Sequence, residues 1–166
     1  MVRVYYSFRT HRAPRFPGVG KAMAQVTHLD KQLEKLITCC EDGYHGYLEA
    51  AKGVETPEIR KRLEENAAER MQFREELKAF NPNVHKDKAE GSTAGKVYRS
   101  WINFKEKLRV SDEEIMADCV VGEKQAIDQY EEVLEDKEID PSLRATVQRQ
   151  HDKIVRHCEW LKAHAV

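Results

Sequence analysis

The side chains best suited to chemistry in this sequence are carboxylates and histidines within amphipathic segments. Glu123 lies about one turn from both Cys119 and Ala126, on an apolar face that must point inward. A buried carboxylate without a partner is costly, so Glu123 should be protonated or bonded to a neighbouring side chain. The partners we expect are His151, His157 and Gln150 of the last segment, and Tyr44 or Tyr130.

A dinuclear metal centre would require a fuller set of ligands than the sequence supplies. Such a centre in a four-helix bundle takes one Glu from each of two helices and a Glu-x-x-His pair from each of the other two. Glu69-x-x-Gln72 has an amide in place of the imidazole, and Gln148-x-x-His151 has an amide in place of the carboxylate. A neutral amide brings no charge and is a weaker ligand for a hard divalent ion than a carboxylate. We therefore expect no intact dinuclear site.

Two hypotheses remain for the surroundings of Glu123. In the first, they form a structural polar layer that fixes helix register, with no cofactor and no catalytic residue. In the second, iron or manganese is held by a degenerate site whose candidate ligands are Glu123, His151, His157, Asp42 and Glu69. The sequence leaves open whether the protein is an enzyme. It contains no G-x-S-x-G, no phosphate-binding glycine loop and no H-E-x-x-H.

The four cysteines carry no metal or disulfide signature. Cys39, Cys40, Cys119 and Cys158 include no C-x-x-C pair, and we expect them to be buried thiols in a reducing, cytoplasmic setting. The sequence has no apolar run of about 18 residues, so no membrane span is expected. Lys and Arg alternate with Glu along the helical faces, which is typical of solvated, ion-paired surfaces rather than of nucleic-acid binding. The partner that we expect is another copy of the same chain, through homo-oligomerisation or other self-association.

Residues 1–25 differ from the rest of the chain. They contain five of the 28 basic residues and no acidic one, so the remainder has 23 basic and 29 acidic residues and a net charge of −6. Three interpretations compete: a targeting segment, an anion-binding tail, or sequence upstream of a true start at Met23. We expect a disordered arm over 1–25, because it lacks a periodic apolar face, and a single domain over 26–166.

Apolar residues recur at spacings of three and four over four long segments, which predicts four helices. The segments span 26–52, 56 to about 80, 111 to about 133, and 140 to the end. Thr27 and Gly53 are the predicted caps of the first helix, and Ser111 with Glu114 forms a capping box for the third. Gly43 and the nearby Gly46 lie inside the first helix, which indicates close approach of another helix.

The connection between the second and third long helices distinguishes between bundle topologies. It is about 30 residues long and includes an amphipathic stretch, 95–108, which we expect to form an extra short helix. The other two links are short, so each flanking pair should be an antiparallel hairpin. One long crossover between two hairpins is the ferritin-like topology. The sequence therefore predicts an all-α, ferritin-like four-helix bundle with one long crossover connection that carries a short helix.

Local strings in all but the second long segment resemble a bacterial family of ferritin-like four-helix-bundle proteins with no assigned function. The strings are Asp42-Gly43, Gly46-Tyr47, Ala50-Ala51, Gly91-Ser92, Gly95, Arg99, Trp101, Cys119, Gly122-Glu123, Ala126, Tyr130, Arg149-Gln150 and His157. The resemblance spans about 27–164 and implies a fold related to di-iron carboxylate proteins without their full ligand set. We expect a non-enzymatic stress-related or assembly protein, with a metal-binding protein as the alternative.

Overall fold

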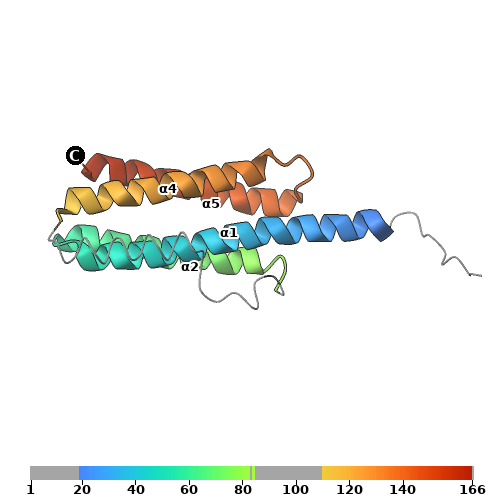
Figure 1. Cartoon of the computed structure of the whole chain (residues 1–166), viewed down its shortest axis with the longest axis horizontal. Coiled ribbons are helices and arrows are strands. Elements are labelled where there is room, and N and C mark those ends of the chain that lie inside the picture. Colours follow the sequence, from blue (N-terminus) through green and yellow to red (C-terminus); the bar gives the residue numbers. More distant parts are fainter. Residues whose placement is uncertain (1–18, 83, 85–109, 166) are drawn as a thin grey trace, which may run out of the picture.

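The computed structural model describes residues 19–82, 84 and 110–165, with side chains described from residue 28 onward. These residues form a bundle of four helices and no strand, which confirms the all-α prediction (Figure 1). The helices are α1 (Val19–Gly53), α2 (Pro57–Lys78), α4 (Asp112–Glu135) and α5 (Pro141–His164). No helix in this described part combines the length and apolar character needed to span a membrane.

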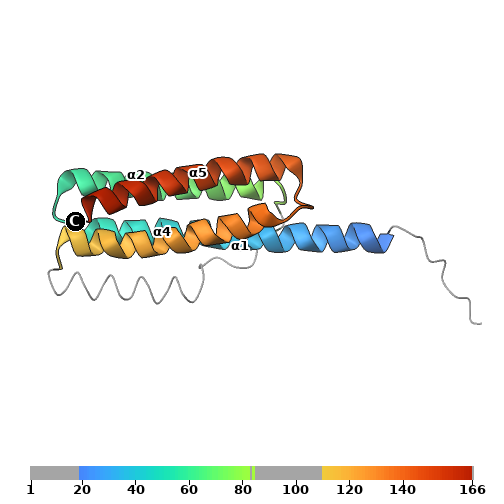
Figure 2. The same cartoon turned by 90° about the horizontal axis from the view of Figure 1, so that it is seen from above.

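The two hairpins pack so that neighbouring helices are antiparallel. Helix α1 lies beside α2 and α4, and α5 lies beside α4 and α2 (Figures 1 and 2). The start of α4 lies beside the link that follows α1. There Asp112 accepts hydrogen bonds from the backbone N–H of Glu55 at 2.7 Å and of Thr56 at 3.0 Å. The end of α2 and the start of α4 therefore lie at opposite ends of the bundle, as the predicted long crossover requires (Figure 1). The predicted short helix at 95–108 lies outside the described residues, and the ferritin-like relationship stays a prediction.

Helix α1 is longer than the sequence pattern indicates. It begins at Val19, seven residues before Val26, so residues 19–25 are helical rather than part of a disordered arm. Its first turns extend beyond the other three helices (Figure 1). The physical reason is that an apolar stripe reports burial, whereas a formed helix can continue through residues of good helix propensity without burial. The predicted N-cap Thr27 is therefore an interior residue, and residues 1–18 lie outside the described part.

Local capping signals account for the starts of two other helices. The Ser111 hydroxyl accepts a hydrogen bond from the Glu114 backbone N–H at 3.4 Å, as predicted. The Asp140 carboxylate accepts from the first turn of α5. Thr56 occupies the N-cap position of α2, but its side chain makes no capping bond. Each side-chain cap of this kind contributes about 1 kcal/mol.

The core consists of two apolar clusters that follow each other along the bundle axis. One contains Leu36 and Phe73, and the other contains Leu63 and Ile115. Every helix passes from one cluster to the other, and burial of each large side chain contributes about 1.5–3 kcal/mol. Polar side chains lie at the level where the clusters meet: α2 places Arg70 between Ala67 and Phe73. This level is where the candidate site is built.

Candidate functional site

Four polar side chains, one from each helix, are buried at the junction of the two apolar clusters. They are Tyr47, Arg70, Glu123 and His157, and we call them the polar layer. The exposed fractions of these whole residues are 3%, 1%, 3% and 6%, respectively, so water screens none of them effectively. Each lies on the apolar face of its own helix, which explains why all four point inward.

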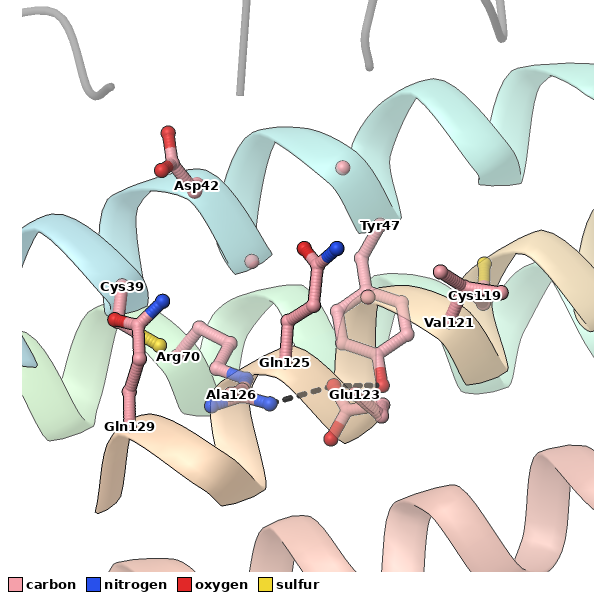
Figure 3. A pocket seen from close by; sticks show the side chains of 13 residues that line it. Cys39, Asp42, Tyr47, Arg70, Cys119, Val121, Glu123, Gln125, Ala126 and Gln129 are labelled. Atoms are coloured by element: carbon pink, nitrogen blue, oxygen red, sulfur yellow. Dashed lines mark hydrogen bonds and ion pairs between the residues drawn. The ribbon is translucent and has the colours of Figure 1, made fainter. Parts of the chain in front are cut away.

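Glu123 is held by two direct hydrogen bonds from other helices (Figure 3). Arg70 Nη2 donates to Glu123 Oε1 at 2.5 Å, and the Tyr47 hydroxyl donates to the same oxygen at 2.6 Å. Burial, the largest single influence, would lower the pKa of Arg70, but the attraction of Glu123 combined with that of Tyr47 and other neighbours outweighs burial and raises the pKa well above its usual value. Burial, reinforced by the negative charge of Glu123, raises the pKa of Tyr47 well above its usual value. The result is a desolvated ion pair with a neutral phenol.

Gly43 provides the space for the guanidinium. A Cβ atom at this position would lie 3.1 Å from Arg70 Nε and 3.3 Å from Arg70 Cδ, which is tighter than ordinary contact. The predicted close approach at this level of α1 is therefore made by the Arg70 side chain of α2.

Several polar atoms in this region lack a hydrogen-bond partner within the described part of the chain. They include Arg70 Nε and Nη1, Glu123 Oε2, His157 Nδ1 and the Nδ2 atom of the buried Asn66. Most buried polar groups in proteins are bonded, so such atoms call for an explanation.

His157 is hydrogen-bonded to Glu69 of α2. Its Nε2 lies 2.8 Å from Glu69 Oε2, and Lys153 also contacts Glu69. Burial lowers the pKa of His157; attraction by Glu123 opposes the shift and repulsion by Arg70 adds to it. The carboxylate can only accept, so the neutral ring carries its proton on Nε2 and leaves Nδ1 as an acceptor.

A second polar cluster lies among residues of the neighbouring apolar cluster. The Tyr130 hydroxyl donates to Gln150 Oε1 at 2.8 Å and lies 3.3 Å from Cys40 Sγ. Gln150 Nε2 donates to the Phe73 carbonyl at 3.2 Å and to Glu76 at 2.8 Å. Gln150 and Tyr130, both predicted partners of Glu123, are therefore bonded to each other instead.

The structure brings two of the five candidate metal ligands into direct contact. Glu69 and His157 are in contact, whereas Glu123 is bonded to Arg70. His151 lies near the surface, 3.5 Å from Glu131. Asp42 lines a cavity on the α1–α4 side. No three His, Cys, Asp or Glu side chains of the described residues are grouped as metal ligands.

The donors around Glu123 do not fit a dinuclear metal centre. Arg70 supplies a fixed positive charge in contact with this carboxylate, and that charge repels a divalent cation. The amides of the two incomplete pairs do not face the layer either, because Gln72 and Gln148 are exposed. Metal binding by the candidate residues stays a prediction.

Arg70 is the functional residue that the pattern analysis missed. The apolar stripe of α2 includes Ala67 and Phe73 and has a gap at residue 70. Residue 70 follows Ala67 by three positions and precedes Leu77 by seven, so it belongs to the same face. A charged residue in such a gap was the available signal, since a buried charge needs a partner of opposite sign.

A cavity of about 170 Å³ opens between α1 and α4 and has the Arg70–Glu123 pair in its lining (Figure 3). Its α1 side includes Gly43 and Gly46, and its α4 side includes Gly122. The Cys39 thiol also lines it, and burial raises the pKa of this thiol to about 12. At neutral pH the thiol is therefore protonated and is a weak nucleophile.

One comparison with known proteins gives a match. A family model described as a domain of unknown function (DUF2383) matches residues 29–136, which include Tyr47, Arg70 and Glu123 but end before α5. No curated protein matches the chain. The predicted resemblance to a family without an assigned function is thus confirmed.

Proposed function

The chain belongs to the DUF2383 family, a domain of unknown function, and we propose that it is a non-enzymatic helical bundle with a structural polar layer. Such a protein acts by assembly with partners rather than by turnover of a substrate. A role in assembly or in a stress response fits this proposal. The observation that carries it is the buried pair of Arg70 and Glu123.

This pair neutralises the charge of Glu123 with a residue of the chain itself. Arg70 Nη2 and Glu123 Oε1 are 2.5 Å apart, and both side chains are almost fully excluded from solvent. Buried polar contacts of this kind favour one helix register over others, because any slip would leave both charges unpaired. The layer therefore supports a single arrangement of the helices.

The reactivity of the described site residues supports a non-catalytic role. Burial raises the pKa values of Cys39, Cys40 and Tyr47, so none of the three is an activated nucleophile at neutral pH. His157 is neutral and hydrogen-bonded to Glu69. General acid–base catalysis needs a group that reaches a substrate proton, and this ring is directed at a neighbouring helix.

Elemental analysis tests the proposal directly. Protein purified without a His-tag should contain far less than one iron or manganese per chain, both as isolated and after anaerobic ferrous loading. The Glu123→Gln variant should remain folded, since the amide oxygen can still accept from Tyr47 and Arg70. A large loss of thermal stability that occurs only when bound metal is stripped would refute the structural role.

A second candidate function, iron or manganese binding, is favoured by the contact between Glu69 and His157. Two predicted ligands from facing helices lie 2.8 Å apart, and His157 Nδ1 has no partner among the described residues. In this case about one metal per chain would be expected. It would be lost in His157→Ala and retained in His151→Ala, because His151 lies elsewhere. The nearby Lys153 ammonium opposes this candidate.

Self-association is the interaction that we expect of a structural bundle, and it stays a prediction. Among the described residues, Val121 is the large hydrophobic side chain that is exposed, at 54%, whereas Trp160 is half-buried. Outward-facing Tyr or Trp side chains, which would have supported self-association, are therefore not found in this part of the chain. Light scattering coupled to size-exclusion chromatography measures the oligomeric state.

A further inference from the structure

We propose that the cavity between α1 and α4 binds a neutral small molecule, about the size of a substituted benzene, whose acceptor oxygen bonds to Arg70. This inference rests on the proposed function in one respect: the Arg70–Glu123 pair must be intact and free of metal. The inference adds to the proposed function that the polar layer contributes to a ligand-binding site.

The cavity is formed by small residues on two facing helices. Gly43 and Gly46 line the α1 side, and Gly122 and Ala126 line the α4 side. A Cβ atom at Gly122 would meet nothing within 4 Å, so the space there is open. An engineered cavity of about 150 Å³ in another protein holds a benzene molecule, so about 170 Å³ suits a ring with a small substituent.

The lining of the cavity includes buried hydrogen-bond donors without a partner. Arg70 is 1% exposed and lines the cavity, and neither its Nε nor its Nη1 has a partner among the described residues. In Figure 3 its guanidinium lies between α1 and α4, with Glu123 on one side. A ligand oxygen that accepts from Nε–H or Nη1–H would satisfy a donor that the fold leaves open.

The charges already present require the ligand to be neutral. The Arg70 and Glu123 charges cancel each other in a desolvated setting. An anion would add uncompensated negative charge beside Glu123 and Asp42, which also line the cavity. A cation would be repelled by Arg70. An uncharged molecule avoids both penalties, because burial of an unpaired charge is costly.

Most of the remaining walls suit an apolar ring, and the Gln125 and Gln129 amides also line the cavity (Figure 3). Val121 and Ala126 of α4 line the cavity together with the Cys39 thiol, which is protonated. An aromatic or aliphatic body therefore meets hydrocarbon and sulfur, while a carbonyl or ether oxygen meets Arg70. The recognised class is thus a neutral, ring-sized carbonyl or ether compound.

A set of four probes of nearly equal size tests the chemistry on the unmodified protein. Acetophenone carries a neutral acceptor oxygen, benzoate an anion, benzamidine a cation, and toluene no polar group. Binding is measured by chemical-shift titration of the full chain. Acetophenone should bind at least about tenfold more tightly than each of the other three, because a difference of about 1.4 kcal/mol corresponds to a factor of ten.

Two variants of α4 locate the site. Gly122→Leu fills the open space and should weaken acetophenone binding by at least about tenfold. Ala117→Leu introduces the same side chain at an exposed position of the same helix and should leave binding unchanged. Circular dichroism establishes that both variants are folded before binding is measured.

Each alternative outcome overturns the inference. Tightest binding of benzoate would make Arg70 an anion site, and tightest binding of benzamidine would make Glu123 a cation site. Equal binding of toluene would show that Arg70 contributes nothing, and no binding of any probe would leave the cavity without this ligand. Acetophenone binding that persists in Gly122→Leu would place the probe elsewhere. The proposed structural role fails separately, through stoichiometric metal in elemental analysis.

Discussion

Removal of one charge from the Arg70–Glu123 pair should destabilise the protein far more than removal of a surface charge. The two side chains are 1% and 4% exposed, so Arg70→Met leaves a buried carboxylate whose only direct partner among the described residues is the Tyr47 hydroxyl. Breaking a buried pair in this way costs about 3–5 kcal/mol of unfolding free energy. For a domain of this size, that corresponds to a fall in melting temperature of about 6–20 °C.

A double-mutant cycle separates the interaction from the individual side chains. Arg70→Met, Glu123→Leu and the double variant are unfolded in urea and followed by far-ultraviolet circular dichroism. Replacement of a whole buried pair by apolar residues is often neutral. The free energy of unfolding of the double variant should therefore exceed, by about 2 kcal/mol or more, the value obtained by adding the two single effects. Glu123→Leu carries an added cost, because the Tyr47 hydroxyl loses its acceptor.

The control is an exposed ion pair on the same bundle. Lys61 and Glu65 are 78% and 51% exposed and 4.0 Å apart, so Lys61→Met should cost less than about 1 kcal/mol. If Arg70→Met were as mild as this control, and if the two buried substitutions were additive, the reasoning would be refuted. The polar layer would then contribute nothing to the register of the helices.

Three further results are expected. Gly122→Ala should raise the free energy of unfolding by up to about 1 kcal/mol in a urea titration, whereas Gly43→Ala should gain less, because its Cβ meets Arg70 at 3.1 Å. The Cys39 thiol, with its pKa raised to about 12 by burial, should be alkylated at about pH 8 only after unfolding, as followed by mass spectrometry. Burial lowers the pKa of His157 below 6.5, so the unfolded chain binds the proton more readily than the folded protein does. The free energy of unfolding should therefore fall as the pH drops below about 6.5. Urea midpoints measured across this range should fall less in the His157→Gln variant.

The main error of the sequence reasoning concerned the partner of Glu123. Its inward direction was predictable, because the apolar period of α4 places it beside Cys119 and Ala126. The partner of Glu123 was not predictable in this way. Two of the expected partners bond elsewhere: His157 bonds to Glu69, and Gln150 bonds to Tyr130. Periodicity shows which face of a helix is buried, but it does not show how far one helix is shifted along its neighbour. A shift of one turn, about 5.4 Å, exchanges one set of partners for another.

The start of α1 shows the same limit for a different reason. The apolar stripe begins near Val26, but the helix begins at Val19. The periodic spacing of apolar residues indicates which part of a helix packs against the core, and a helix can extend beyond that part. The composition of residues 19–25 permits the extension, yet nothing in their pattern requires it.

What the sequence by itself determined is therefore local: four amphipathic helices, the cap at Ser111, and the inward direction of Glu123. These features depend on contacts within a turn or two of one chain segment. The tertiary structure alone decided that Arg70, 53 residues away in sequence, neutralises Glu123 and leaves two of its nitrogen atoms without partners beside a cavity. Such a pairing depends on the axial shift and rotation of packed helices, which only the completed core sets.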